Sequence, residues 1–116
     1  MKCRFCYRDM VHENETSSYE MGDFIIFDTY LCPVCIAEFV VFHDTDTLVE
    51  YNLQAGNYRL NFNVSAETCK LETRDKTPMG TILQGWVTVI DFKKNVPQHV
   101  TPQNVKDKIK LFLVFS

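Results

Sequence analysis

Glycine and long apolar runs are both scarce in this sequence, and each shortage excludes a class of protein. Only 4 of the 116 residues are glycine, which leaves little capacity for phosphate-cradling loops, and the chain has no nucleophile elbow or paired-carboxylate signature. No apolar run approaches the roughly 18 residues that a membrane-spanning helix needs. The sequence therefore predicts a protein that is not an enzyme and does not cross a membrane.

The first residues, from Met1 to Cys6, lack the apolar segment that directs secretion. We therefore expect a cytoplasmic location, where thiols stay reduced and disulfides rarely persist. Five cysteines is also an odd number, which a closed disulfide framework does not accommodate. Metal ligation or burial thus accounts for the cysteines better than disulfide bonding does.

Positive charge is missing from a long internal segment. Residues 12–56 contain no Lys or Arg but have nine acidic residues, which are Glu13, Glu15, Glu20, Asp23, Asp28, Glu38, Asp44, Asp46 and Glu50. Residues 57–116 hold nine basic residues against five acidic ones, so the net charge of −3 conceals a strong asymmetry. A segment this acidic repels a nucleic-acid backbone and attracts basic surfaces.

Two Cys-x-x-Cys pairs form the strongest motif in the chain. Cys3 and Cys6 make the first pair, Cys32 and Cys35 make the second, and 25 residues separate the pairs. Structural zinc sites use four such thiolates in a tetrahedron, which leaves no position for a catalytic water. We therefore predict a structural zinc ion on Cys3, Cys6, Cys32 and Cys35.

Three alternatives to a zinc site stay open for the cysteine pairs. Buried thiols account for one or two cysteines only, a redox dithiol needs just one pair, and iron–sulfur clusters favour spacings that group three cysteines. Cys69 lies in a predicted strand and is expected to be a structural thiol. His12, His43 and His99 stand singly, so each is expected to be a surface or capped residue rather than a ligand.

Residues 1–42 are predicted to form a zinc ribbon. The first knuckle is followed by a polar loop at His12–Gly22, a strand at Asp23–Leu31, the second knuckle at Cys32–Cys35 and a last strand at Ile36–Phe42. The sequences Cys3-Arg4-Phe5-Cys6 and Cys32-Pro33-Val34-Cys35 resemble the knuckles of zinc-ribbon proteins. This resemblance covers the first third of the chain and implies the fold only.

Residues 48–116 are predicted to form an antiparallel sheet with a C-terminal helix, after a polar break at residues 43–47. Apolar and polar residues alternate through Tyr58, Leu60, Phe62 and Val64, as in a half-buried strand, and Ala55-Gly56-Asn57 indicates a hairpin turn. The expected strands are Leu48–Gln54, Tyr58–Ser65, Thr68–Thr73 and Thr81–Phe92.

The C-terminal helix is indicated by its start and by its apolar face. Thr101 suits the N-cap and Pro102 the first helical position, while Val105, Ile109, Phe112 and Leu113 share one side. A strand over Ile109–Phe115 is the competing interpretation. The predicted fold class is therefore α+β, with an N-terminal zinc ribbon followed by an antiparallel β-meander and a C-terminal helix.

The charge distribution favours a protein partner, such as one with a basic surface, over nucleic acid. The alternative is nucleic-acid binding through two basic surfaces. The first is a basic-aromatic first knuckle, formed by Lys2, Arg4, Phe5, Tyr7 and Arg8. The second is a patch formed by Lys93, Lys94, Lys106, Lys108 and Lys110. An enzymatic pocket around Tyr51, Tyr58 and Trp86 is a further alternative, although aromatic residues at strand spacing are far more often core.

The C-terminal stretch carries a second resemblance. Val100–Val105, Lys108–Lys110 and Leu113–Ser116 are similar to the ends of small phage and prophage proteins, to which no activity is assigned. This resemblance implies a phage origin. Together with the acidic segment, it implies a modulator of a host nucleic-acid enzyme in the host cytoplasm, of the anti-CRISPR or RNA-polymerase-regulator class.

Overall fold

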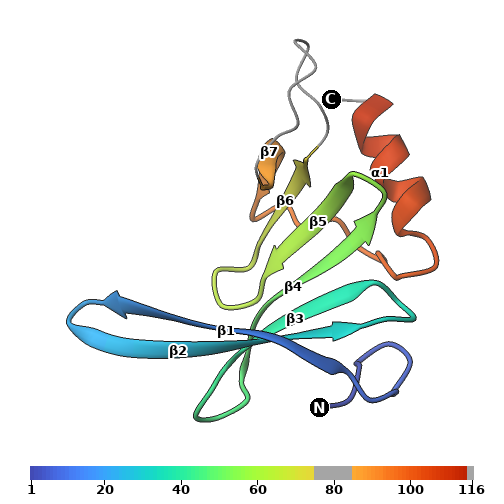
Figure 1. The fold of residues 1–116 in the computed structure, drawn as a ribbon. Coiled ribbons are helices and arrows are strands. Elements are labelled where there is room, and N and C mark those ends of the chain that lie inside the picture. The colour runs from blue at the N-terminus through green and yellow to red at the C-terminus, as the bar shows by residue number, and fades with distance from the viewer. Residues whose placement is uncertain (75–84, 115–116) are drawn as a thin grey trace.

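Seven strands form one antiparallel sheet, in which each strand pairs with its neighbours in the chain (Figure 1). The computed structural model describes residues 1–74 and 85–114. Within these residues the elements are β1 (Val11–Glu20), β2 (Asp23–Cys32), β3 (Ala37–Phe42), β4 (Leu48–Ala55), β5 (Tyr58–Asn63), β6 (Thr68–Thr73), β7 (Val87–Lys93) and α1 (Val105–Val114). The fold class is α+β, as predicted.

The N-terminal part contains a strand that the sequence does not indicate. The interpretation of His12–Gly22 as a loop is wrong, because this segment forms β1 and pairs with β2 along its whole length. A two-residue turn joins the strands, with positive φ at Met21 (51°) and Gly22 (86°). Because β1 lies at the edge of the sheet and most of its side chains are exposed, it needs no apolar alternation.

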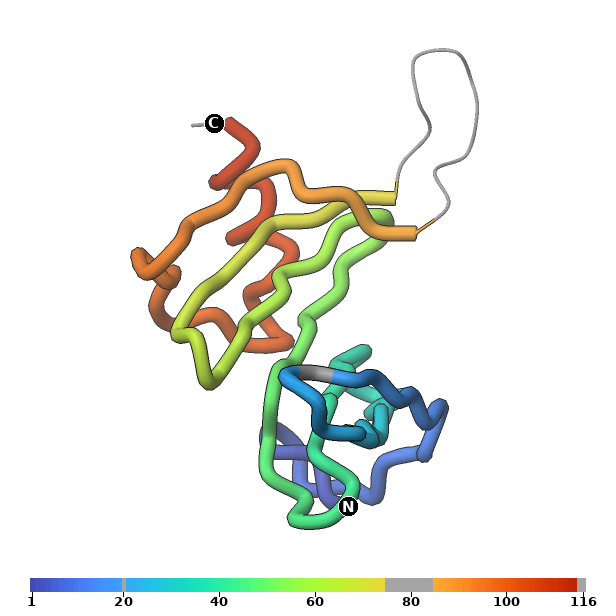
Figure 2. Tube along the Cα trace, turned by 90° about the vertical axis from the view of Figure 1, so that its left-hand side faces the viewer, coloured from blue at the N-terminus to red at the C-terminus, as the bar shows by residue number. Residues whose placement is uncertain are grey.

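The strands expected for the ribbon and for the meander belong to the same sheet. β4 pairs with β3 through Leu48–Leu53 and with β5 through Glu50–Ala55. Figure 2 shows β4 running from the part that holds β1 to β3 into the part that holds β5 to β7. The polar break at residues 43–47 is the connection between β3 and β4. The division into units 1–42 and 48–116 stays a prediction.

The strands predicted in the second half are present, with shifted ends. β5 buries Leu60 and Phe62, as the alternation indicates, while Val64 lies beyond the strand and is exposed. The predicted hairpin is formed with Gly56 at a positive φ of 61°. The last predicted strand is shorter than expected and begins at Val87, and the expected residues 81–84 lie outside the described part of the chain.

The core lies on one face of the sheet, where α1 packs against β4 and β5. Side chains at alternate strand positions supply its fully buried members, among them Cys32, Ala37, Phe39, Val41, Leu53, Leu60 and Leu71. From α1, Val105 and Ile109 are buried, and the ring of Phe112 meets that of Phe92 edge-on with centroids 5.0 Å apart. Burial of these apolar side chains stabilises the fold.

The helix begins at Val105, and a turn from the predicted N-cap Thr101 leads into it. The carbonyl of Thr101 accepts the amide of Val105 at 2.9 Å, and the side-chain oxygen of Asn104 accepts the amide of Thr101 at 2.7 Å. The alternative of a strand over Ile109–Phe115 is therefore wrong for the described residues. Among these residues, no helix has the length and apolar character needed to span a membrane.

We expect Phe39→Ala to lower the free energy of unfolding by about 3–5 kcal/mol, because the ring is almost fully buried and its removal leaves a cavity. Urea denaturation monitored by circular dichroism measures this loss. Val64→Ala is the control and should stay within about 0.5 kcal/mol of wild type, since Val64 is exposed. Equal losses for the two variants would contradict the assignment of the core.

Candidate metal centre

Each Cys-x-x-Cys pair closes a turn of the same geometry. The carbonyl of Cys3 accepts the amide of Tyr7 at 3.0 Å, and the carbonyl of Cys32 accepts the amide of Ile36 at 2.9 Å. Within each turn an amide also donates to the sulfur of the first cysteine, at 3.4 Å. These backbone donors favour the thiolate form, but at Cys3 burial outweighs them and raises the pKa of the thiol.

Strand pairing brings the two turns together. The second turn joins β2 to β3, and the first precedes β1, where Lys2 bridges to Asp9. Because β1 and β2 pair from Val11 opposite Leu31, the residues ahead of β1 lie beside the end of β2. The two turns therefore meet although 25 residues separate them in the chain.

The four cysteine sulfur atoms lie within 4.8 Å of one another. The distance is 3.9 Å between the sulfurs of Cys3 and Cys35 and 3.5 Å between those of Cys6 and Cys32. A tetrahedral zinc ion with Zn–S bonds of about 2.3 Å places its sulfurs about 3.8 Å apart. The donor set and its spacing thus fit a metal ion such as zinc.

Without an ion, Cys32 and Cys35 do not ionise equally. Burial opposes ionisation of Cys32, but hydrogen bonds from the Cys35 backbone and the Cys6 side chain lower its pKa to about 7. Burial and the neighbouring thiols raise the pKa of Cys35 to about 12. The thiolate form is therefore favoured at Cys32 and opposed at Cys35. A divalent cation would offset the repulsion between neighbouring thiolates.

Phe5 anchors the first turn to the core of the sheet. Its ring centroid lies 6.1 Å from that of Phe39 and 6.3 Å from that of Tyr51, and Tyr51 stacks on Phe62 at 4.8 Å. The metal centre therefore rests on the main aromatic stack. Of the two aromatic residues in the predicted basic-aromatic tip, Phe5 therefore packs against the core, whereas Tyr7 is largely exposed.

Both turns end on a residue with positive φ, Tyr7 at 61° and Ile36 at 54°. This left-handed conformation costs an L-residue other than glycine about 1–2 kcal/mol, and it is rarer still for a β-branched side chain. Local preference therefore does not account for the two turns. The strands on either side and the clustered sulfurs impose their shape.

The fifth cysteine, Cys69, stands outside the cluster, as a fully buried core residue of β6. Burial raises the pKa of its thiol to about 12, so it stays protonated. Its position agrees with a structural thiol.

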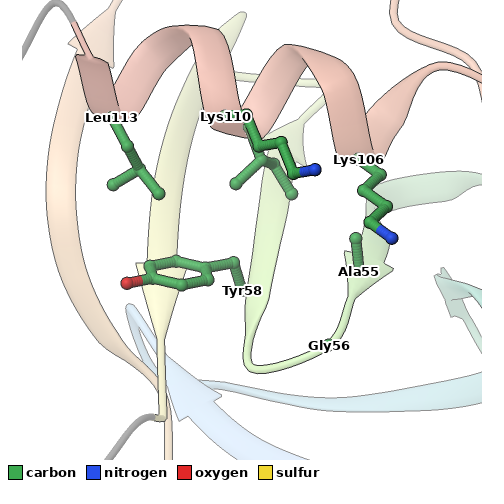
Figure 3. A pocket seen from close by; sticks show the side chains of 7 residues that line it. Ala55, Gly56, Tyr58, Lys106, Lys110 and Leu113 are labelled. Carbon is green, nitrogen blue, oxygen red and sulfur yellow. The ribbon is translucent and has the colours of Figure 1, made fainter.

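The three aromatic residues of the predicted pocket do not share one cavity. Tyr58 lines a cavity of about 370 Å³ between α1 and the β4–β5 hairpin, over which Lys106 and Lys110 project from the helix (Figure 3). Tyr51 belongs to the core stack. The guanidinium groups of Arg59 and Arg74 lie over the ring of Trp86, at 4.5 and 4.9 Å from its centroid.

The structure also assembles a group that sequence reasoning missed. His12 and His43, which stand singly in the sequence, meet on the buried carboxylate of Asp28. The distances are 3.0 Å from His12 Nε2 and 2.7 Å from His43 Nδ1 to separate carboxylate oxygens. No local signal predicts this contact, because it depends on the β1–β2 register and on the turn after β3. His99 is not part of the group.

Comparison with known proteins finds no matching family model, no matching curated protein and no matching solved structure. The similarity of Val100–Ser116 to phage proteins therefore gains no support from them. Function has to be inferred from the sites themselves.

We expect the purified protein to contain one zinc ion per chain, measured by elemental mass spectrometry. Cys6→Ser should lose the ion, since it removes one of four thiolate ligands, whereas Cys69→Ala should retain it. A chelator should release the ion from wild type and disorder the N-terminal strands, as amide exchange would show. Zinc-free wild-type protein that is fully folded would contradict this assignment.

The contribution of Asp28 and His43 to the free energy of unfolding should depend on pH. Hydrogen bonds from His12 and then His43 lower the pKa of Asp28, and the bond to Asp28 raises the pKa of His43 above 6.5. The contribution of Asp28 is lost as pH falls through its lowered pKa. The contribution of His43 is complete below 6.5 and is lost as pH rises through its raised pKa.

The free energy of unfolding should therefore differ more between wild type and Asp28→Asn at about pH 5.5 than at about pH 9. Urea titrations of both proteins at each pH test this. The cysteine site is common to both proteins, so its own pH dependence cancels in the difference. A difference that does not change with pH would exclude a charged His43 as the source of the stabilisation.

Proposed function

We propose that this protein is a small, non-enzymatic zinc-binding module that binds a protein partner with a basic surface. The observation that carries the proposal is the hairpin formed by β1 and β2. It is acidic, it carries exposed aromatic residues at its tip, and the metal centre lies at its base.

A structural role for the ion is supported by the donor set. Four cysteines supply every ligand of a tetrahedral zinc ion and leave no position for a reacting water. The centre lies where the first turn, the base of the hairpin and the β2–β3 turn meet. An ion there would hold the hairpin in a defined direction relative to the rest of the sheet.

The outer half of the hairpin is a two-stranded arm. Residues 17–20 of β1 pair with residues 23–26 of β2, whereas β3 pairs with β2 only from Phe27 onward. Figure 1 shows this arm reaching away from the remaining strands. Isolated two-stranded ribbons are marginally stable in water, so an arm of this kind gains from a partner that covers it.

The tip of the arm presents apolar surface. Tyr19 is 78% exposed and Phe24 is 55% exposed, and their rings touch with centroids 5.1 Å apart. Met21, in the turn between them, is fully exposed. Aromatic and methionine side chains that protrude together are typical of the centre of a protein–protein interface.

Charge along the hairpin favours a basic partner. Glu13, Glu15 and Asp23 are exposed on the hairpin, and residues 12–56 contain no Lys or Arg to offset them. Complementary charge accelerates encounter with a basic surface and repels nucleic acid. An enzyme that acts on nucleic acid has a basic surface of this kind, so it fits the proposed partner class.

Nucleic-acid binding is the second candidate, favoured by Lys106 and Lys110 beside the apolar cavity. Against it, the ammonium group of Lys2 pairs with Asp9 at 2.7 Å and Phe5 packs in the core, which reduces the basic-aromatic tip.

We expect Tyr19→Ser combined with Phe24→Ser to abolish partner binding while zinc content and folding stay unchanged, since both side chains are exposed. Affinity purification from cells that make the protein, quantified by mass spectrometry, should recover a basic partner with wild type. The matched control is Val87→Ser combined with Val89→Ser, which removes exposed apolar side chains from the opposite edge strand.

Binding of the recovered partner, once purified, should weaken as salt concentration rises. Equal recovery with both double variants would exclude the arm as the binding surface. Salt-dependent binding of random-sequence DNA or RNA that Lys106→Gln and Lys110→Gln remove would instead establish the second candidate.

A further inference from the structure

A second set of metal-ligating side chains lies outside the cysteine centre. One ligand atom each from Glu15, Asp28 and His43 lies within 4.8 Å of the other two. The three residues come from β1, from β2 and from the turn that follows β3. We propose that Glu15, Asp28 and His43 bind a divalent transition-metal ion, with Zn²⁺ as the best fit, and that His12 positions Asp28 for it.

Strand register accounts for the meeting of these side chains. Glu15 is paired directly with Asp28, so the two carboxylates share one face of the sheet. Asp28 is paired with Val41 of β3, and two residues later the chain turns at His43, whose amide donates to the carbonyl of Ile26 at 2.9 Å. This backbone bond fixes the position of His43 beside Asp28.

A β-bulge places His12 on the same face. Its register partner is Tyr30, and the register shifts between His12 and Asn14. In a regular strand, residues three apart, such as His12 and Glu15, point to opposite faces. Because the bulge adds one residue, His12 and Glu15 point to the same face of the sheet. Glu13 points away from the group.

The group around Asp28 carries more acidic than basic side chains. Asp28 has a side chain that is only 7% exposed, and it lies directly across from a second carboxylate. Asp44 and Asp46 in the adjoining turn add negative charge, and the only basic groups identified on Asp28 within the described residues are the two histidines. A divalent cation would be attracted by both carboxylates, of which Asp28 is buried and Glu15 is exposed.

The donor set selects the class of ion. One imidazole nitrogen with two carboxylate oxygens suits Zn²⁺ or Mn²⁺ better than Ca²⁺ or Mg²⁺, which prefer oxygen ligands only. Donors on a tetrahedral zinc ion lie about 3.3 Å apart, so the 2.7 Å between His43 and Asp28 has to widen by about half an ångström. His43 is half exposed, which leaves its ring room to rotate.

Ion binding requires a bare nitrogen on His43. In the structure His43 Nδ1 donates to an Asp28 carboxylate oxygen at 2.7 Å. When the ion binds, this proton moves to Nε2 of the neutral ring, or leaves to water if the ring is charged. His12 meanwhile donates to the other oxygen of Asp28 at 3.0 Å, as residues behind metal ligands commonly do.

The test is a zinc titration of tag-free protein that already carries the cysteine-bound ion, by isothermal calorimetry. Wild type should bind one further Zn²⁺ per chain. Glu15→Gln and His43→Gln should each weaken this second binding at least about tenfold, and His12→Gln should weaken it less, because it acts through Asp28. The first equivalent should be unaffected in every variant.

Two substitutions serve as matched controls. Glu13→Gln removes the same charge two residues away on the other face, and His99→Gln removes a histidine outside the group, so both should bind as wild type does. Titration with Co²⁺ gives an independent readout, since a second equivalent on nitrogen and oxygen shows no sulfur-to-cobalt charge-transfer band.

The proposal is overturned if wild type takes up no second equivalent below about 1 mM free zinc, or if Glu15→Gln and His43→Gln bind it unchanged. The result does not depend on whether the hairpin tip binds a protein.

Discussion

The register of β2 against its two neighbours is the constraint on which both ligand clusters depend. Cys32 ends this strand and leads into the second cysteine turn, while Asp28 lies in its middle between Glu15 and Val41. A shift of one residue would turn every side chain of β2 to the opposite face. Such a shift would separate the cysteine pairs and remove Asp28 from the two histidines, so one set of backbone hydrogen bonds determines both sites.

The two clusters differ in their surroundings. The cysteine turns lie against Phe5, Phe39 and Tyr51, so the first cluster borders the apolar core. The group around Asp28 lies beyond that aromatic stack and relies on two hydrogen bonds from half-exposed histidines. These hydrogen bonds respond to pH and to ion binding. The first cluster therefore suits a permanent structural ion, and the second suits an exchangeable one.

Local signals predicted the elements that bury a regular apolar face. Leu60 and Phe62 alternate with polar residues on β5, and Val105 and Ile109 recur at helical spacing on α1, so burial follows directly from period. β1 escaped prediction because an edge strand with solvent on both faces has no such period. It forms because β2, which is apolar, offers it a full ladder of backbone partners.

The sequence by itself determined the candidate cysteine cluster, the α+β class and the acidic character of residues 12–56, because each is a property of residue type and spacing along the chain. Tertiary structure alone decided that all seven strands share one sheet, that Tyr19 and Phe24 meet at an exposed tip, and that His12 and His43 converge on Asp28. These outcomes depend on strand register and on a bulge. Both arise from backbone hydrogen bonds between distant segments, and the order of side chains does not encode them locally.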